Sequence, residues 1–221
     1  MIVGIGHVAR VGKDTAAEAL CRDLQFVRLG FADQLKELAM VADPLITSAT
    51  RTINTHIGHG RLKWTVEGVG GWGPAKDMYP EVRAFLQRLG EGARKVFGED
   101  FWIDRLMERA QWHDNVVIPD VRYRNEAEKI REQGGVLIRI NRPGRVASGH
   151  VSETELVDFD WDQEFDNSGS VMDLQQNVVT FVKSKLQLRK ALSEPVNGAA
   201  RALTINDLEA TLEKVYSEEP K

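Results

Sequence analysis

Short apolar runs alternate with amphipathic segments along most of this chain. Four runs predict buried strands, at residues 2–5, 26–29, 115–119 and 136–140, and Phe165 begins a last short strand. Apolar side chains at helical spacing predict helices between them, at residues 13–24, 30–39, 80–97, 100–111, 125–133 and 171–188. This order predicts an α/β fold: a central, mostly parallel five-stranded sheet with helices on both faces.

Other segments depart from that alternation. Residues 43–79 are irregular and precede the helix at 80–97, so about 43–97 is interpreted as a helical insert. In the helix that begins near Gly30, the buried stripe is predicted to be Leu35, Leu38 and Ala39. Residues 191–221 are read as a linker and a charged terminal helix, outside a main domain of residues 1–190.

The first strand leads directly into the most informative motif. A loop rich in small residues follows it, and a helix begins near Lys13, which is the order of a phosphate-binding loop. Gly12 permits close approach of phosphate oxygens, and the first amides of the helix have no acceptor within it. Lys13 adds a cation for the β- and γ-phosphates, and the Thr15 hydroxyl suits Mg²⁺.

The loop departs from the usual pattern at two points. Asp14 separates Lys13 from Thr15, and His7 stands where the first loop glycine is expected, which suggests a loop longer by one residue. A glycine-containing turn that binds nothing is the structural alternative. Gly-Lys-x-Thr directly after a strand is specific enough to favour a nucleotide site.

Composition narrows the classes of function. A net charge of −4 and a sequence pI near 5.8 argue against stable, non-specific nucleic-acid binding. Cys21 is the only cysteine, so no disulfide within the chain is expected. No apolar run reaches the roughly 20 residues of a membrane span, and a cytoplasmic location is predicted.

Two further groups of charged residues follow strands. Asp120 and Arg122 come at the end of the strand at 115–119, where open α/β sheets place their chemistry; a strand-end ion pair is the alternative. Arg142 and Arg145 flank a Pro-Gly turn after the next strand. They suit a lid over phosphates, at about 141–156, although a solvated basic turn would look the same.

Several segments taken together resemble the phage-type deoxynucleoside monophosphate kinases, a branch of the P-loop nucleoside monophosphate kinases. The resemblance runs from residue 9 to about residue 170 in the order of that family. It is carried by ARVGKDT (9–15), GFADQLK (30–36), GWGPAK (71–76), PEVRAFLQRLG (80–90), FGEDFWIDRL (97–106), DVRYRNEAE (120–128), RPG (142–144) and HVSETEL (150–156). Glu91 and Gly92 stand where the family usually has Thr-Glu, so no acceptor contact is assigned to position 91.

The resemblance implies a P-loop three-layer fold and transfer of a phosphoryl group from ATP, with Mg²⁺, to a deoxynucleoside monophosphate. It implies that the catalytic residues are Lys13, Asp120, Arg122 and Arg142, and that Thr15, with Asp120 acting through water, holds Mg²⁺. The residues expected to bind ATP are Ala9, Arg10, Val11, Gly12, Lys13, Asp14, Thr15 and Arg145. Those expected to bind the acceptor are Phe31, Asp33, Lys36, Arg83, Gln87, Arg94, Arg124 and Glu153.

The expected partners are small nucleotides, without membrane or stable nucleic-acid binding, and a homodimer would suit the family. If the gene is carried by a phage, the location is the host cytosol. Two other functions stay open. One is a kinase for another small phosphorylated acceptor, similar to dephospho-coenzyme A kinases. The other is a regulatory protein that binds nucleotides without catalysis, which only His7 favours.

Overall fold

The computed structural model describes residues 1–6, 8, 10–47, 59–145 and 155–193. Five parallel strands form the central sheet in the order β2-β5-β1-β6-β7. They are β1 (Ile2–Gly6), β2 (Val27–Arg28), β5 (Val116–Val121), β6 (Val136–Asn141) and β7 (Gln163–Asp166). The predicted α/β class and the order of its elements are therefore confirmed.

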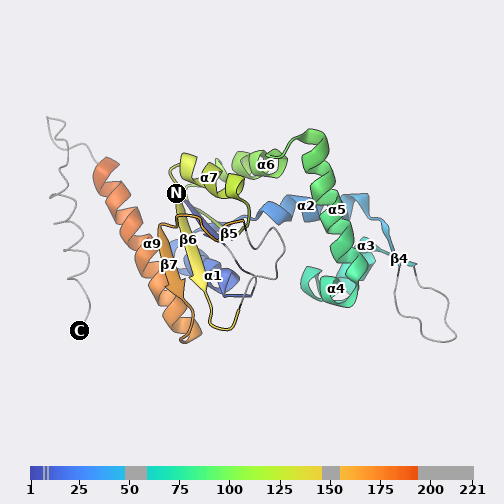
Figure 1. The fold of residues 1–221 in the computed structure, drawn as a ribbon, viewed down its shortest axis with the longest axis horizontal. Helices are drawn as coiled ribbons and strands as arrows, with labels where there is room; N and C mark the ends of the chain where they lie inside the picture. The colour runs from blue at the N-terminus through green and yellow to red at the C-terminus, as the bar shows by residue number, and fades with distance from the viewer. Residues whose placement is uncertain (7, 9, 48–58, 146–154, 194–221) are drawn as a thin grey trace.

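Helices cover both faces of this sheet (Figure 1). On one face, α1 (Lys13–Leu24) and α9 (Val171–Ser193) pack together over Val3 and Ile5. On the other face, α7 (Arg124–Glu132) packs with the segment that contains Leu156, Phe159 and Trp161. Side chains alternate across a strand, so β1 supplies apolar residues to the first face and Gly4 and Gly6 to the second.

The insert lies beside the sheet as a separate lobe (Figure 1). It contains the two-stranded sheet of β3 (Leu45–Thr47) and β4 (His59–Arg61), followed by α3 (Leu62–Gly68), α4 (Trp72–Met78) and α5 (Pro80–Phe97). A third apolar cluster holds it together, with Leu62, Val82 and Leu86 at its centre. Helix α6 (Phe101–Ala110) leads from α5 back to β5.

Helix α2 (Phe31–Ala42) connects the sheet to this lobe. Ala39 is buried and Leu35 packs against the insert cluster, as predicted, but Leu38 is 42% exposed, so its predicted burial was wrong. Leu35 and Ala39 are four residues apart and lie on one face, whereas Leu38 lies beside that face. Because α2 starts at the sheet and ends in the insert, its first turn lies between the two.

No helix in the described part of the chain is both long and apolar enough to cross a membrane.

Candidate phosphoryl-transfer site

The loop between β1 and α1 has the backbone that its sequence predicts. Gly12 has φ 109° and ψ 14°, a left-handed conformation that residues with a side chain rarely adopt. The first helical hydrogen bond runs from the Ala16 N–H to the Gly12 carbonyl at 3.0 Å. The N–H groups of Asp14 and Thr15 come before it, at the end of a helix where backbone N–H groups commonly bind anions.

One contact within this loop and one from a distant strand end hold it in place. The Lys13 ammonium donates to the Val8 carbonyl, and the Asn167 side-chain amide donates to the Val11 carbonyl at 2.8 Å. Asn167 directly follows β7, an edge strand of the sheet, so the end of that strand helps to fix the loop. Val11 itself is buried in the first core cluster.

An aromatic ring limits the size of the residue that can end β1. A Cβ placed on Gly6 would lie 2.4 Å from a ring carbon of Trp161, which is closer than any side-chain carbon could approach. The loop therefore begins at a residue that cannot carry a side chain. The effect of His7, the next residue, lies outside the described residues.

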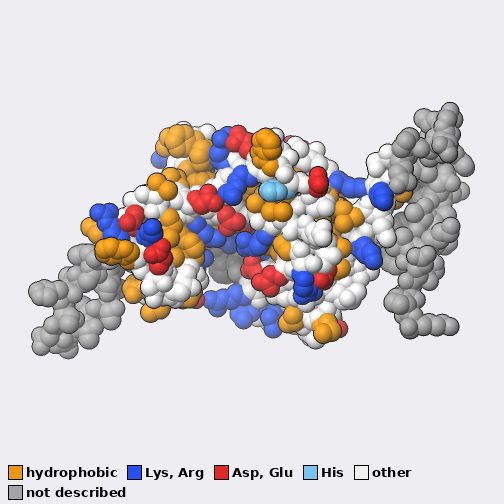
Figure 2. Space-filling model, turned by 180° about the vertical axis from the view of Figure 1, so that it is seen from behind, with side chains coloured by type: hydrophobic (Ala, Val, Ile, Leu, Met, Phe, Trp, Pro, Cys, Tyr) orange, Lys and Arg blue, Asp and Glu red, His pale blue; other side chains and the backbone are white. Residues whose placement is uncertain are grey.

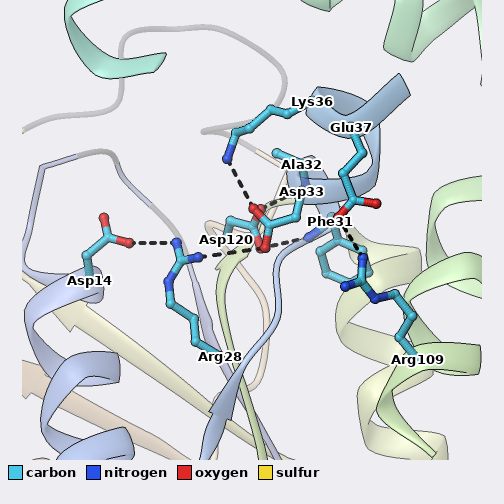
Figure 3. A network of polar contacts seen from close by, with 9 residues as sticks. All are labelled: Asp14, Arg28, Phe31, Ala32, Asp33, Lys36, Glu37, Arg109 and Asp120. Carbon is cyan, nitrogen blue, oxygen red and sulfur yellow. Dashed lines mark hydrogen bonds and ion pairs between the residues drawn. The ribbon is translucent and has the colours of Figure 1, made fainter. Parts of the chain in front are cut away.

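Asp120 lies at the carboxyl end of β5 and ties that strand to α2. Its carboxylate accepts hydrogen bonds from the N–H groups of Phe31 and Ala32, each at 3.1 Å (Figure 3). Burial raises the pKa of Asp120, and these amides and the charge of Arg122 only partly oppose that effect. A cation placed nearby would favour the ionised form.

A chain of alternating charges connects α1 to α2 in front of Asp120 (Figure 3). The guanidinium of Arg28, at the end of β2, donates to Asp14 at 3.1 Å and lies 3.7 Å from Asp33. Asp33 in turn accepts from Lys36 at 3.1 Å. Burial alone would lower the pKa of Arg28, but the hydrogen bond to Asp14 and the nearby acidic charges raise it.

A cluster of cations lies where the insert meets the sheet. Burial lowers the pKa of Lys76 in α4, and the charges of Lys36, Arg83 and Arg122 lower it further, so the four cations are close together. Figure 2 shows Lys and Arg side chains around a hollow on one face of the molecule. Cations gathered around a partly buried lysine form a site that an anion would stabilise.

The insert contacts the phosphate-binding loop through Asp77. Its carboxylate lies 4.0 Å from the Arg10 guanidinium and 3.3 Å from that of Arg83. Arg10 belongs to the loop and Arg83 to α5. Asp77 therefore lies between a cation of the loop and a cation of the insert.

The buried Glu126 side chain bonds to the backbone at the start of α7, next to Arg122 of the cation cluster. One oxygen of its carboxylate accepts from the N–H groups of Arg122 and Tyr123, at 2.7 and 3.0 Å. Burial raises the pKa of Glu126 to about 8, because these two hydrogen bonds offset only part of the desolvation cost and the charge of Asp120 adds to it. The Arg94 guanidinium lies 4.5 Å from the centre of the Tyr123 ring.

The structure brings together a large part of the predicted site. Lys36, Arg83 and Arg122 belong to the cation cluster, and Asp33 and Asp120 lie at the first turn of α2. The remaining predicted residues are placed differently: Phe31 is in the second core cluster, Arg124 lies against Phe159, and Gln87, Arg142 and Arg145 are exposed. Ala9 and Glu153 lie outside the described residues, as do residues 146–154 of the predicted lid.

Sequence reasoning missed several residues at this site. Lys76 and Glu126 were part of recognised motifs but were given no role, and Arg28, Asn167 and Trp161 were not singled out. Arg28, Asn167 and Trp161 act through contacts with residues far away in the chain, whereas Glu126 accepts from the nearby N–H groups of Arg122 and Tyr123. The local signals that could have indicated these residues are the charge of Arg28 at a strand end and the place of Glu126 in the first turn of a helix.

Among the described residues, no group of three or more His, Cys, Asp or Glu side chains could hold a metal ion. The two predicted Mg²⁺ contacts, Thr15 and Asp120, suit a metal that also uses phosphate oxygens and water. Mg²⁺ in proteins commonly has one or two side-chain contacts of this kind.

Comparison with known proteins agrees with this geometry. A family model described as deoxynucleotide monophosphate kinase matches residues 75–178. A protein of Acanthamoeba polyphaga mimivirus, provisionally named a deoxynucleotide monophosphate kinase, is 30% identical over 201 residues, covering 85% of this chain and 99% of its own.

Two solved structures are more distant. Shikimate kinase from Aquifex aeolicus is 11% identical with a TM-score of 0.43, and covers 84% of this chain and 98% of its own. Dephospho-CoA kinase from Campylobacter jejuni is 14% identical with a TM-score of 0.43, and covers 85% of this chain and 98% of its own.

Proposed function

Because the chain belongs to the deoxynucleotide monophosphate kinase family, and is thus a phosphotransferase, we propose that it transfers the γ-phosphoryl group of ATP to deoxynucleoside 5′-monophosphates. The observation that carries this proposal is the cation cluster of Lys76, Lys36, Arg83 and Arg122, in which Arg83 shares the Asp77 carboxylate with Arg10 of the loop before α1. A loop that ends in a helix N-terminus and a group of cations linked to it suit a polyphosphate donor and a phosphorylated acceptor.

On the donor side, the amides at the start of α1 and the Lys13 ammonium would bind the β- and γ-phosphates. Arg10 extends from the same loop towards the insert. Arg142 and Arg145, in the exposed turn after β6, are proposed to close over the phosphates, as guanidinium groups match phosphate oxygens in pairs. Mg²⁺ bound with the donor would neutralise phosphate charge, with Thr15 and, through water, Asp120 as its protein contacts.

On the acceptor side, Lys36, Lys76 and Arg83 would bind the monophosphate. The acceptor is already an ionised phosphate, so no general base is required, and Asp14 is not assigned that role. Transfer then depends on in-line placement of the two phosphates and on cationic charge at the moving group, to which Arg122 is proposed to contribute. Arg94, which lies over the Tyr123 ring, is proposed to contact the nucleoside.

The test is a coupled assay of ADP release with ATP, Mg²⁺ and each of dAMP, dGMP, dCMP, dTMP and their ribose counterparts. Turnover with at least one deoxynucleotide is expected. Dephospho-coenzyme A is included, since it is the acceptor that the main alternative requires. Lys13→Ala should reduce turnover by about 10³-fold or more without changing the unfolding curve, because the residue acts on the transferred phosphate.

Turnover of dephospho-coenzyme A alone would replace this proposal with the alternative. Absence of transfer to any acceptor, together with tight ATP binding, would favour a regulatory role. Near-normal turnover in Lys13→Ala would show that the loop is not the donor site.

A further inference from the structure

Arg28 is the last residue of β2, the edge strand of the sheet, and its side chain extends to the site (Figure 3). Its two terminal nitrogens contact different helices: one donates to Asp14 of α1 and the other lies 3.7 Å from Asp33 of α2. The side chain is 41% exposed, so it contributes little to the core. Its position between two helices indicates a role in the site.

Three carboxylates surround this guanidinium. The charges of Asp33, Asp14 and Asp120 all act on Arg28. Asp33 and Asp120 approach the same point, since a Cβ on Gly30 would lie 3.1 Å from an oxygen of each. A phosphate group would be repelled by three such carboxylates if nothing neutralised them.

Asp33 has two cationic partners, and only one of them belongs to the cation cluster. Lys36 donates to one oxygen of Asp33 at 3.1 Å, while Arg28 lies beside the other oxygen. When Lys36 also donates to an acceptor phosphate, the Asp33 carboxylate competes with that phosphate for its charge. That competition is weaker when Arg28 remains to neutralise the carboxylate.

We propose that Arg28 is a positioning residue for acceptor binding: by neutralising Asp33 it releases Lys36 to the acceptor phosphate. The inference rests on the proposed function, because it names how that acceptor site is kept positive. Arg28 itself does not touch the acceptor. Without Arg28, Asp33 would keep Lys36, and the acceptor would bind more weakly.

The test is a double-mutant cycle on acceptor binding. Isothermal titration calorimetry is carried out with dAMP, dGMP, dCMP and dTMP on the wild type, Arg28→Met, Asp33→Asn and the double variant. Arg28→Met should raise the Kd of the tightest-bound nucleotide about tenfold. A change of that size is what the loss of one charge-assisted hydrogen bond causes in a dissociation constant. In the Asp33→Asn background the same change should alter Kd by less than about twofold, because no carboxylate is left to hold Lys36.

Arg109→Met is the matched control. Arg109 pairs with Glu37 at 2.9 Å, also on α2, and is 46% exposed, but it lies away from Asp33 (Figure 3). Its loss should leave Kd unchanged, which separates local electrostatics from general loosening of α2. If Arg28→Met does not fold, Arg28→Lys is used in the same cycle, with a smaller rise in Kd expected.

Each other outcome overturns the inference in a recognisable way. An equal rise in Kd in both backgrounds would mean that Arg28 acts on the acceptor directly, and no rise would mean that it does not act on binding. If Arg109→Met weakens binding as much, the effect is structural. If the wild type binds none of the four nucleotides, the proposed function fails along with the inference.

Discussion

The buried carboxyl group of Glu126 should make the stability of this protein fall as pH rises. Glu126 is 7% exposed, and burial raises its pKa to about 8, from an ordinary value of 4.5. The folded protein therefore keeps a proton that the unfolded chain releases. Its contribution is complete below pH 4.5 and is lost progressively as pH rises towards 8.

The size of this effect follows from the two pKa values. Between pH 5 and pH 7 the difference in proton binding removes about 2 kcal/mol from the free energy of unfolding. In a protein of this size that corresponds to about 4–8 °C in Tm. Glu126→Gln keeps an oxygen for the Arg122 and Tyr123 amides and has no proton to lose. The free energy of unfolding of the variant should therefore rise relative to wild type by about 2 kcal/mol from pH 5 to pH 7.

Urea denaturation at pH 5, 6 and 7 measures this difference. Glu128→Gln is the control, because Glu128 lies two residues further along α7 and is exposed. It should follow the wild type at each pH. A constant difference between Glu126→Gln and wild type over this range would refute the reasoning, since it would mean that Glu126 is ionised in the folded protein at pH 5.

Three further predictions concern the residues that shape the site. Gly6→Ala should destabilise the protein by about 1–3 kcal/mol, because the new methyl group would overlap the Trp161 ring, and denaturation curves superimposed on wild type would contradict this. Asn167→Ala removes the hydrogen bond to the Val11 carbonyl, so the KM for ATP should rise about fivefold while that for the acceptor stays constant; equal rises in both would indicate general disorder of the site. Lys76→Met should raise the KM for the acceptor about tenfold with little change in the KM for ATP. Steady-state kinetics with each substrate varied measures both constants, and a rise in the KM for ATP alone would contradict the prediction.

The sequence alone determined the layers of this protein and the loop that we propose as the donor site. Strand and helix patterns are local, because they follow from the spacing of apolar residues within one segment. The phosphate-binding loop is local as well: Gly12, Lys13 and Thr15 lie within four residues, so the helix that begins there places them without help from elsewhere.

Only the tertiary structure decided which charged residues come together in the part that we propose as the acceptor site. Lys76 is one lysine among many in the sequence, and it becomes a candidate only because α4 packs it near Lys36 and Arg122. Arg28 gains its role from carboxylates on two different helices, and Glu126 gains its high pKa from burial under the turn that begins α7. Charge interactions depend on distance and solvent exposure, and neither quantity is encoded in residue spacing within one segment.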